Sequence, residues 1–393
     1  MAVIISQDEK VFHLQTDEVS YVFQVMENGE LEQIYFGKRV HSKEAYRNLT
    51  TKERREAMVA WRTDRDYFQP DNIKQEYSSF GKGDFREPAY QVEQENGSRI
   101  TELKYQSYRL AKGKKRLSEL PSAFAENDDV ETLEITLLDK LIGLQVVLKY
   151  SVFPHQNVIV RSTEFSNQGD EKLNILRALS SQIDLPDSNY DFISFAGSWA
   201  RERHEVIRRI KSGIQSISSL RTASSHQQNP FILLARPETT EDDGDVFAFN
   251  LIYSGNFLDQ VEVSQYDTSR VLVGINPEEF SWHLDPSTSF QTPEAVLSFS
   301  DHGKNKISQQ LADFYQNHLI NQRFAKQQRP VLVNNWEATY FDFDEKKLLA
   351  IAEKAAELGI ELFVLDDGWF GHRDDDTTSL GDWFVDKNSC RTA

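Results

Sequence analysis

The segment that decides the fold runs from Val331 to Gly368 and reads VLVNNWEATY FDFDEKKLLA IAEKAAELGI ELFVLDDG. It contains a short apolar run at Val331–Val333, then a helical pattern, and then a second apolar run at Ile360–Leu365, interrupted only by Glu361. Continuous apolar strands joined by a helix form a βαβ unit, in which the strands are parallel and buried on both faces. The segment therefore predicts the beginning of an α/β domain.

The helix of this unit is expected over Asp344–Leu358. Asp344 is a suitable N-cap, and Gly359 suits the left-handed residue that often follows a helix. The apolar residues between them recur at helical spacing and would form one face: Leu348, Leu349, Ala352, Ala355 and Ala356.

Before Pro330 the pattern is different, because short apolar runs alternate with turn residues such as Asn28-Gly29 and Asn96-Gly97. Several runs have the period of two that is typical of half-buried strands. Strands are predicted at Val11–Gln15, Tyr21–Met26, Leu31–Phe36, Ile100–Leu110, Val130–Leu138, Leu144–Val152, Val158–Ser166, Phe231–Ala235, Val246–Tyr253 and Val271–Ile275. Many short strands without intervening helices indicate a large antiparallel sandwich.

A helix is predicted over Lys304–Lys326, where it would connect the two regions. Its apolar residues share one face of a 3.6-residue period: Ile307, Leu311, Phe314, Tyr315 and Leu319. The predicted domains are therefore residues 1–328, a sandwich with a C-terminal linker helix, and residues 329–393, the α/β segment.

Composition excludes several classes of function. The chain has 44 Lys and Arg against 62 Asp and Glu, so its formal net charge of −18 argues against nucleic-acid binding. Its one cysteine, Cys390, allows no intrachain disulfide and makes a Cys-based zinc site improbable. No apolar stretch approaches the ~20 residues of a membrane helix, and no secretory signal is visible, so a cytoplasmic protein without a membrane partner is expected.

The residues that could carry chemistry follow the predicted strands. Asp366 and Asp367 come directly after the second strand, at the end that faces the ligand crevice in α/β folds. Adjacent acids repel, so a ligand with several donors, or a cation, would offset their charge, although a solvated turn before Gly368 is an equal alternative. Trp336, on the same rim, offers an apolar face to a sugar or simply caps the strand layer.

Two further clusters have alternative interpretations. Trp199, within Gly197–His204, could project from a loop, although composition alone favours a buried tryptophan with two ion-paired arginines. His372 with Asp374, Asp375 and Asp376 has the residue types of a metal site, but such Asp-rich runs are usually solvated loops, so no metal and no cofactor are expected.

Together these segments resemble the bacterial α-galactosidases of glycoside hydrolase family 36, along the chain up to about Lys387. The segments that carry the resemblance are Gln75–Tyr77, Gly83–Tyr90, Gly197–His204, Ser224–Phe231, Tyr253–Phe257, Arg329–Ala338 and Phe363–Phe370. The resemblance implies an N-terminal β-supersandwich followed by a (β/α)8 TIM barrel. It also implies release of terminal α-linked galactose from oligosaccharides such as raffinose and melibiose, with retention and without a metal, in proteins that are often tetramers.

The resemblance also assigns site residues. Asp366 and Asp367 would hydrogen-bond galactose hydroxyls, Trp336 would stack near the sugar, and Trp199 would reach the mouth of the active site. The family's nucleophile lies in a Lys-Trp-Asp motif, which does not occur in this sequence. Both catalytic carboxylates are therefore expected beyond residue 393, and no residue here is named as catalytic.

A TIM barrel typically needs ~250 residues, so residues 331–393 are expected to form only its first βαβ unit. This leaves two functional hypotheses. The first is an α-galactosidase chain that is catalytically incomplete by itself. The alternative is a non-catalytic galactoside-binding or assembly module that uses the sandwich and Trp199.

Overall fold

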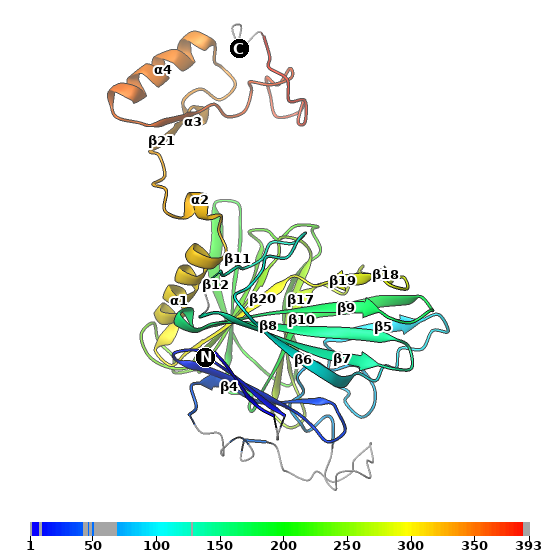
Figure 1. Ribbon diagram of the computed structural model, residues 1–393. Coiled ribbons are helices and arrows are strands. Elements are labelled where there is room, and N and C mark those ends of the chain that lie inside the picture. Colours follow the sequence, from blue (N-terminus) through cyan, green and yellow to red (C-terminus); the bar gives the residue numbers. More distant parts are fainter. Residues whose placement is uncertain are drawn as a thin grey trace. The chain divides into compact units, whose positions relative to one another are not determined.

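The computed structural model describes residues 2–7, 10–41, 46, 49–50, 69–126 and 129–387 (Figure 1). It divides the chain into two compact units, Met1–Ile320 and Asn321–Ala393. The sequence-based boundary at 328/329 stays a prediction, and Cys390 lies outside the described residues. None of the helices in the described part of the chain is long and apolar enough to cross a membrane.

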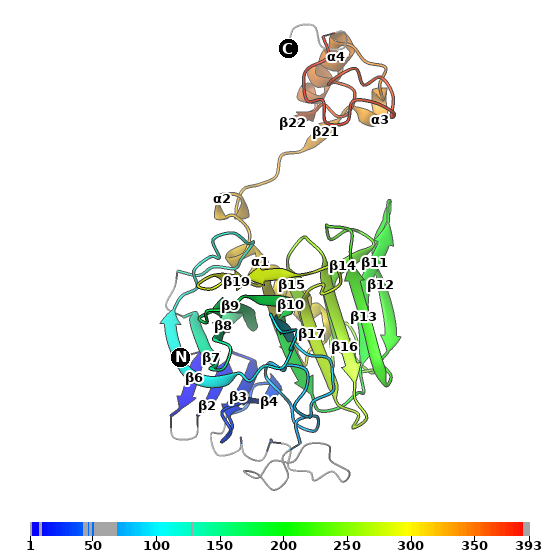
Figure 2. The ribbon, with the colours of Figure 1, turned by 90° about the vertical axis from the view of Figure 1, so that its right-hand side faces the viewer.

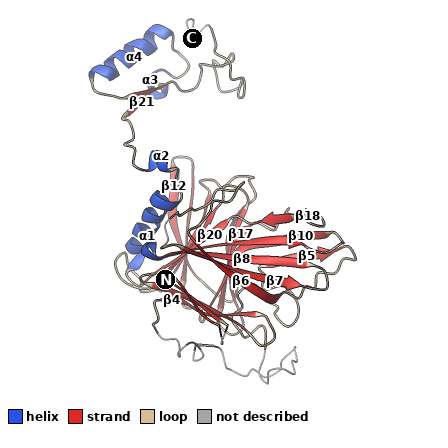
Figure 3. Cartoon of the chain, viewed as in Figure 1, coloured by secondary structure: helices blue, strands red, loops and turns tan. Residues whose placement is uncertain are grey.

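The first unit consists almost entirely of strands (Figure 3). Within its described residues, one sheet has the order β1 (Val3–Ser6), β2 (Val11–Gln15), β3 (Val19–Val25) and β4 (Leu31–Lys38). A second has the order β13 (Gly213–Ser219), β16 (Phe257–Val263), β17 (Ser269–Ile275), β10 (Leu173–Leu185) and β18 (Trp282–Leu284), with β5 (Tyr90–Gln94) also paired to β10.

The third and largest sheet completes the first unit (Figure 2). Its order is β12 (Arg201–Arg209), β11 (Asp191–Ser198), β14 (Gln228–Ala235), β15 (Val246–Ile252), β20 (Glu294–Ser300), β9 (Val158–Asn167), β8 (Leu144–Phe153), β7 (Glu131–Asp139) and β6 (Lys104–Lys112), with β19 (Ser289–Gln291) paired to β9. A short 3-10 helix, η2 (Pro154–Gln156), links β8 and β9. The strand pairs within these three sheets are antiparallel, as predicted.

The alternation of residues explains how these strands pack. In β7 every second side chain is buried, and the buried set includes Leu133, Ile135 and Leu137. These residues belong to a hydrophobic core that draws on all three sheets of the unit. The edge strand β12 is the exception, because all nine of its residues are exposed. Its sequence, RERHEVIRR, is mostly charged, which protects an exposed edge from pairing with other chains.

The predicted helix over 304–326 is two helices. α1 (Gly303–His318) buries Ile307, Leu311 and Phe314 against a second apolar cluster on the large sheet, as its periodicity predicts. It ends because the backbone N–H groups of Leu319 and Ile320 both bond to the carbonyl of Tyr315. The Asn321 side chain then accepts a hydrogen bond from the Arg323 N–H and caps α2 (Gln322–Ala325). The single-helix prediction is therefore wrong at 319–321.

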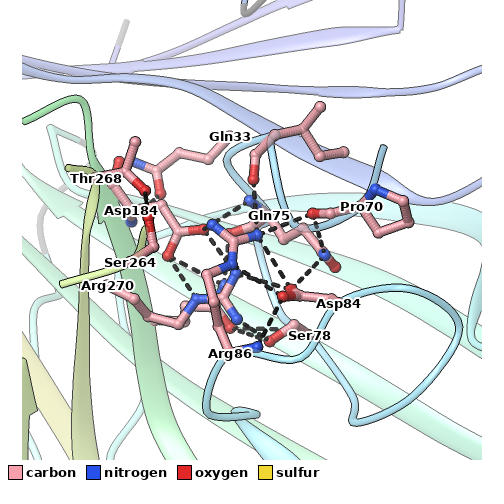
Figure 4. A network of polar contacts seen from close by, with 12 residues as sticks. Gln33, Pro70, Gln75, Ser78, Asp84, Arg86, Asp184, Ser264, Thr268 and Arg270 are labelled. Carbon is pink, nitrogen blue, oxygen red and sulfur yellow. Dashed lines mark hydrogen bonds and ion pairs between the residues drawn. The ribbon is translucent and has the colours of Figure 1, made fainter. Parts of the chain in front are cut away.

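A network of charged residues lies inside the first unit (Figure 4). Arg270 binds Asp184 in bidentate fashion, with Nε and Nη2 both 2.8 Å from carboxylate oxygens, and it lies 3.0 Å from Asp84. Arg86 donates to Asp84 at 2.9 Å and to the carbonyls of Pro70 and Ile73. Burial alone would raise the pKa of Asp84, but Arg270 and Arg86 lower it below its usual value.

A second buried group combines an arginine with an acid and two tyrosines. Arg161 lies 2.9 Å from Glu76, which accepts hydrogen bonds from Tyr21 at 2.5 Å and Tyr150 at 2.6 Å. Burial raises the pKa of Glu76 despite the nearby guanidinium. Glu76, Asp84 and Arg86 all lie in segments that carry the family resemblance, so those segments owe their residue types to the core of the sandwich.

One buried acid has no such partner. Asp259 in β16 is fully buried, and neither of its carboxylate oxygens makes a hydrogen bond with the described residues. Its neighbours across the sheet are Ile217 in β13 and Val273 in β17, both members of the apolar core. Burial raises the pKa of Asp259 well above its usual value.

The second unit contains the predicted βαβ pattern. β21 (Leu332–Asn334) and β22 (Leu362–Val364) pair in parallel, and between them lie α3 (Trp336–Thr339) and α4 (Glu345–Glu357). Asp344 caps α4 by accepting a hydrogen bond from the Lys347 N–H at 2.8 Å, and Gly359 has a φ of 82°. Both predicted ends of the helix are therefore confirmed.

The prediction that these strands are buried on both faces is wrong for the described residues. Leu332 in β21 is 50% exposed and Leu362 in β22 is 41% exposed. The apolar cluster of this unit is small: Phe343 and Leu348 are buried, and only partly buried residues such as Phe363 and Leu365 pack against them. Each of the two strands therefore leaves an apolar side chain exposed to solvent.

Candidate functional site

The two parallel strands bring their carboxyl ends together in the second unit. Asn334, the last residue of β21, is in register with Val364 of β22, two residues before Asp366. The Asn334 side-chain amide donates a hydrogen bond to Asp366 Oδ2 at 2.6 Å. The first predicted site residue therefore lies at the strand ends, held by the neighbouring strand.

Asn335 also forms hydrogen bonds at these strand ends. Its side chain is fully buried, accepts a hydrogen bond from the Asp366 N–H at 2.8 Å and donates to Thr339 Oγ1 at 3.0 Å. The sequence alone predicts no role for Asn334 or Asn335. A pair of amides directly after an apolar strand was the available signal, because amides at a strand end often bond to the neighbouring loop.

Asp367 has a different partner. The Arg373 Nε donates to Asp367 Oδ1 at 2.5 Å, and the Gly368 N–H donates to the same oxygen at 2.9 Å. The hydrogen bond from Arg373 is the main reason that the pKa of Asp367 lies below its usual value. Among the described residues, Oδ2 of Asp367 has no hydrogen-bond donor, and the side chain is 21% exposed.

The protein itself offsets the repulsion between the adjacent acids. Asp366 Oδ1 accepts the Asp367 N–H at 2.8 Å, Asp366 Oδ2 accepts the Asn334 amide, and Asp367 is ion-paired with Arg373. An arginine of the chain therefore offsets charge that the sequence-based interpretation attributed to a ligand with several donors or to a cation. The result is a fixed pair of carboxylates that can accept hydrogen bonds from ligand hydroxyls.

Trp336 lies at the same strand end. Its backbone N–H donates to Asn334 Oδ1 at 2.8 Å, which links it to the residue that holds Asp366. The half-buried indole packs edge-on against Tyr340 and Phe341, with ring centroids 5.2 and 4.9 Å apart. Asn334 therefore links Trp336 to Asp366, and Asp367 follows Asp366 directly in the chain.

Trp199 belongs to the first unit and lies in the turn between β11 and β12. It is 86% exposed, so the alternative of a buried tryptophan is wrong. The turn needs its small residues: Ala200 has a φ of 57°, and a Cβ on Gly197 would lie 2.1 Å from the carbonyl oxygen of Arg201. The close approach of β11 and β12 at this turn therefore leaves the Trp199 indole exposed to solvent.

Other segments that carry the resemblance meet next to this turn. Ala196 in β11 pairs with Gln228, at the start of β14. In the loop before β14, the Ser224 N–H donates to the carbonyl of Ser254 at 2.6 Å, and Thr222 N–H donates to Asn256 Oδ1 at 2.7 Å. Three segments far apart in the sequence therefore gather at one end of the sandwich.

The Asp-rich loop after the acid pair has no metal-site geometry. Among the described residues, no group of three or more His, Cys, Asp or Glu side chains could hold a metal ion. Asp375 instead accepts hydrogen bonds from Thr377, which order the loop locally.

Comparison with known proteins finds two family models that together cover most of the chain. Residues 29–285 match the glycosyl hydrolase family 36 N-terminal domain, and residues 289–392 match the melibiase family. The chain is 49% identical to α-galactosidase AgaA of Geobacillus stearothermophilus over 98% of its own length and 53% of that protein, and 42% identical to α-galactosidase 1 of Pediococcus pentosaceus over 98% and 52%. It thus spans about half the length of the curated relatives it matches.

Solved structures give the same result. The crystal structure of the α-galactosidase from Lactobacillus brevis superposes with a TM-score of 0.96 at 60% identity, covering 98% of this chain and 52% of that one. A variant of α-galactosidase AgaA from Geobacillus stearothermophilus, solved in complex with raffinose, has a TM-score of 0.94 at 48% identity and covers 98% and 53%.

Proposed function

The chain belongs to glycosyl hydrolase family 36, and from this premise we propose that it has the sequence of an α-galactosidase. In this proposal its second unit binds the terminal galactose of α-galactosides. Raffinose and stachyose, bound in the related structures, indicate the class of oligosaccharide. The observation that carries the proposal is the carboxylate pair Asp366–Asp367 at the ends of parallel strands, held by Asn334 and Arg373. In this proposal the βαβ unit is the first of a (β/α)8 barrel, and the sandwich is the family's β-supersandwich.

The pair suits galactose because hydrogen bonds from Asn334 and Arg373 hold its carboxylate oxygens in place. A hydrogen bond to a charged carboxylate contributes about 1.5–3 kcal/mol. A site built on such bonds rejects an epimer whose hydroxyl points elsewhere, since the carboxylate would then be left without its donor. Galactose and glucose differ in the orientation of one hydroxyl, so they are the natural test pair.

The pair does not suit the acid and base of the reaction. A retaining glycosidase needs two carboxyl groups ~5–5.5 Å apart, one of which must hold a proton near neutral pH. Arg373 lowers the pKa of Asp367, so this carboxyl is ionised at neutral pH and cannot protonate a leaving group. Oδ1 and Oδ2 of Asp366 both accept hydrogen bonds from the chain. We assign both residues to substrate binding.

The family's Lys-Trp-Asp motif does not occur in this sequence, so no residue of the chain is proposed as nucleophile. We therefore expect the 393-residue chain to bind galactosides without hydrolysing them. The test is calorimetric titration of the chain with galactose and, as the epimer control, glucose, together with an assay on an aryl α-galactoside. Binding of galactose but not glucose supports the proposal, whereas equal binding of both, or of neither, contradicts it. Turnover of the aryl galactoside contradicts the assignment of roles.

A second candidate function, a galactoside-binding or assembly module of the sandwich, is favoured by one observation: Trp199 is 86% exposed. Two variants of the full chain separate the candidates. In the first proposal Asp366→Asn weakens galactose binding more than Trp199→Ala does. In the second, the order is reversed.

A further inference from the structure

Arg373 is an unusual neighbour for a binding site, because it is almost fully buried. Its side chain is 5% exposed, and its guanidinium lies 5.7 Å from the centroid of the Phe341 ring. Besides Asp367, Nη1 donates to the carbonyl of Thr378 at 2.6 Å, and Nη2 lies 3.7 Å from Asp376, whose side chain is 84% exposed. The strongest charged partner of Arg373 is therefore Asp367.

The contact restricts the Asp367 carboxylate. Two donors, Arg373 Nε and the Gly368 N–H, both bond to Oδ1. A carboxylate held at one oxygen by two donors cannot rotate about its terminal bond without losing one of them. The second oxygen, Oδ2, is thereby kept in one orientation and available to a ligand.

We propose that Arg373 is a positioning residue that orients Asp367 so that its free oxygen accepts a hydrogen bond from a hydroxyl of a neutral sugar. The inference deepens the proposed function and rests on it. The guanidinium is almost fully buried and its charge is paired with Asp367, which is why the ligand is a neutral polyol and not a phosphate or a carboxylate.

A purely structural role is the competing explanation. Arg373 also fastens its own loop, through the bond from its N–H to the Phe370 carbonyl at 3.3 Å and through Thr378. Loss of the loop would weaken ligand binding equally at every pH. Loss of the charge on Arg373 would, in addition, change the pH at which Asp367 takes up a proton.

The experiment uses the full chain in four forms: wild type, Arg373→Met, Arg373→Lys and, as the matched control, Asp376→Asn. Galactose dissociation constants are measured as a function of pH, and the protonation of Asp367 is followed by carbon-13 NMR of its carboxyl group without any sugar. Arg373→Lys retains a charge in the loop, so it keeps the test usable if Arg373→Met does not fold.

We expect Arg373→Met to weaken galactose binding about tenfold or more, since one charge-assisted hydrogen bond loses its orientation. Arg373→Lys should recover part of that loss, and Asp376→Asn should behave like wild type. The pKa of Asp367 should rise in Arg373→Met, and the pH at which binding falls to half should rise with it.

An unchanged Asp367 titration in both Arg373 variants would overturn the inference, even if binding weakens, because the arginine would then act on the loop alone. If the wild-type chain binds no galactose, the proposed function fails, and the sugar-free titration still decides whether Arg373 controls Asp367.

Discussion

Arginine meets aspartate in both units of the chain, but with different results. In the sandwich, Arg270 binds both oxygens of Asp184, and both side chains are 1% exposed. In the second unit, Arg373 binds one oxygen of Asp367, which is 21% exposed and keeps its other oxygen available. An acid that is buried and bound by an arginine at both oxygens stabilises the fold, whereas a partly exposed acid that keeps acceptor capacity can recognise a ligand.

The largest effect is expected in the sandwich. Arg270→Leu leaves Asp184 buried without its bidentate partner and weakens the contact to Asp84, so the free energy of unfolding should fall by about 3–5 kcal/mol. Urea denaturation of the full chain measures it. Lys354→Met, which breaks the exposed pair with Glu357, is the control and should cost less than about 1 kcal/mol. Equal losses of stability in the two variants would contradict the prediction that burial makes the Arg270 network more stabilising than an exposed ion pair.

The opposite pattern is expected for Asp366. Asp366→Asn retains an oxygen for the Asn334 amide but loses the acceptor of the Asp367 N–H, so the free energy of unfolding should fall by only about 0.5–1.5 kcal/mol. Galactose binding should weaken about tenfold or more, because a charged acceptor is replaced by a neutral one. Calorimetry and a melting curve on the same sample measure both quantities. A large drop in melting temperature with unchanged galactose affinity would show that Asp366 stabilises the fold, like the buried acids of the sandwich, and does not bind the sugar.

Asp259 sharpens the comparison, because it is a core acid without an arginine. Its pKa is raised in the folded state, so the native protein holds a proton that the unfolded chain releases. The stability of the folded state that depends on this bound proton is fully present below the usual pKa of aspartate. It is lost as the pH rises above that value.

Asp259→Asn removes this titration at nearly constant shape. The variant should gain stability relative to wild type as the pH rises, so its advantage should be larger at pH 8 than at pH 5.5. Denaturation at the two pH values checks it. A gain that does not change with pH would show that ionisation of Asp259 plays no part.

The smallest effect concerns Trp199. The indole is 86% exposed, so Trp199→Ala should leave the melting temperature nearly unchanged. Its effect on galactose affinity should be smaller than that of Asp366→Asn, as measured by the same calorimetric titration. A loss of affinity larger than that of Asp366→Asn would favour the sandwich as the binding unit.

The features that sequence could predict are those set by local pattern. Alternating residues in β7 and the Asp344 cap of α4 follow from neighbours in the chain, and the structure contains both. The exposed faces of Leu332 and Leu362 were not foreseen, because strand composition reports what a residue prefers and not what covers it.

The candidate site shows the same limit. Asp366 and Asp367 could be found because two acids after an apolar strand are conspicuous. Arg373 could not, since its pairing with Asp367 depends on the path of the intervening loop. The unpaired state of Asp259 could not be predicted from the sequence either, because it depends on residues of β13 and β17 that are distant in sequence.

The central claim is that the acid pair of the second unit, and not the charged network of the sandwich, meets the sugar. Nitrogen-15 NMR of the full chain during galactose titration tests it most directly. We predict that the side-chain signals of Asn334 Nδ2 and Arg373 Nε shift with galactose and stay in place with glucose, while Arg270 Nε does not move. Shifts confined to the first unit, or identical shifts with both sugars, would contradict the account.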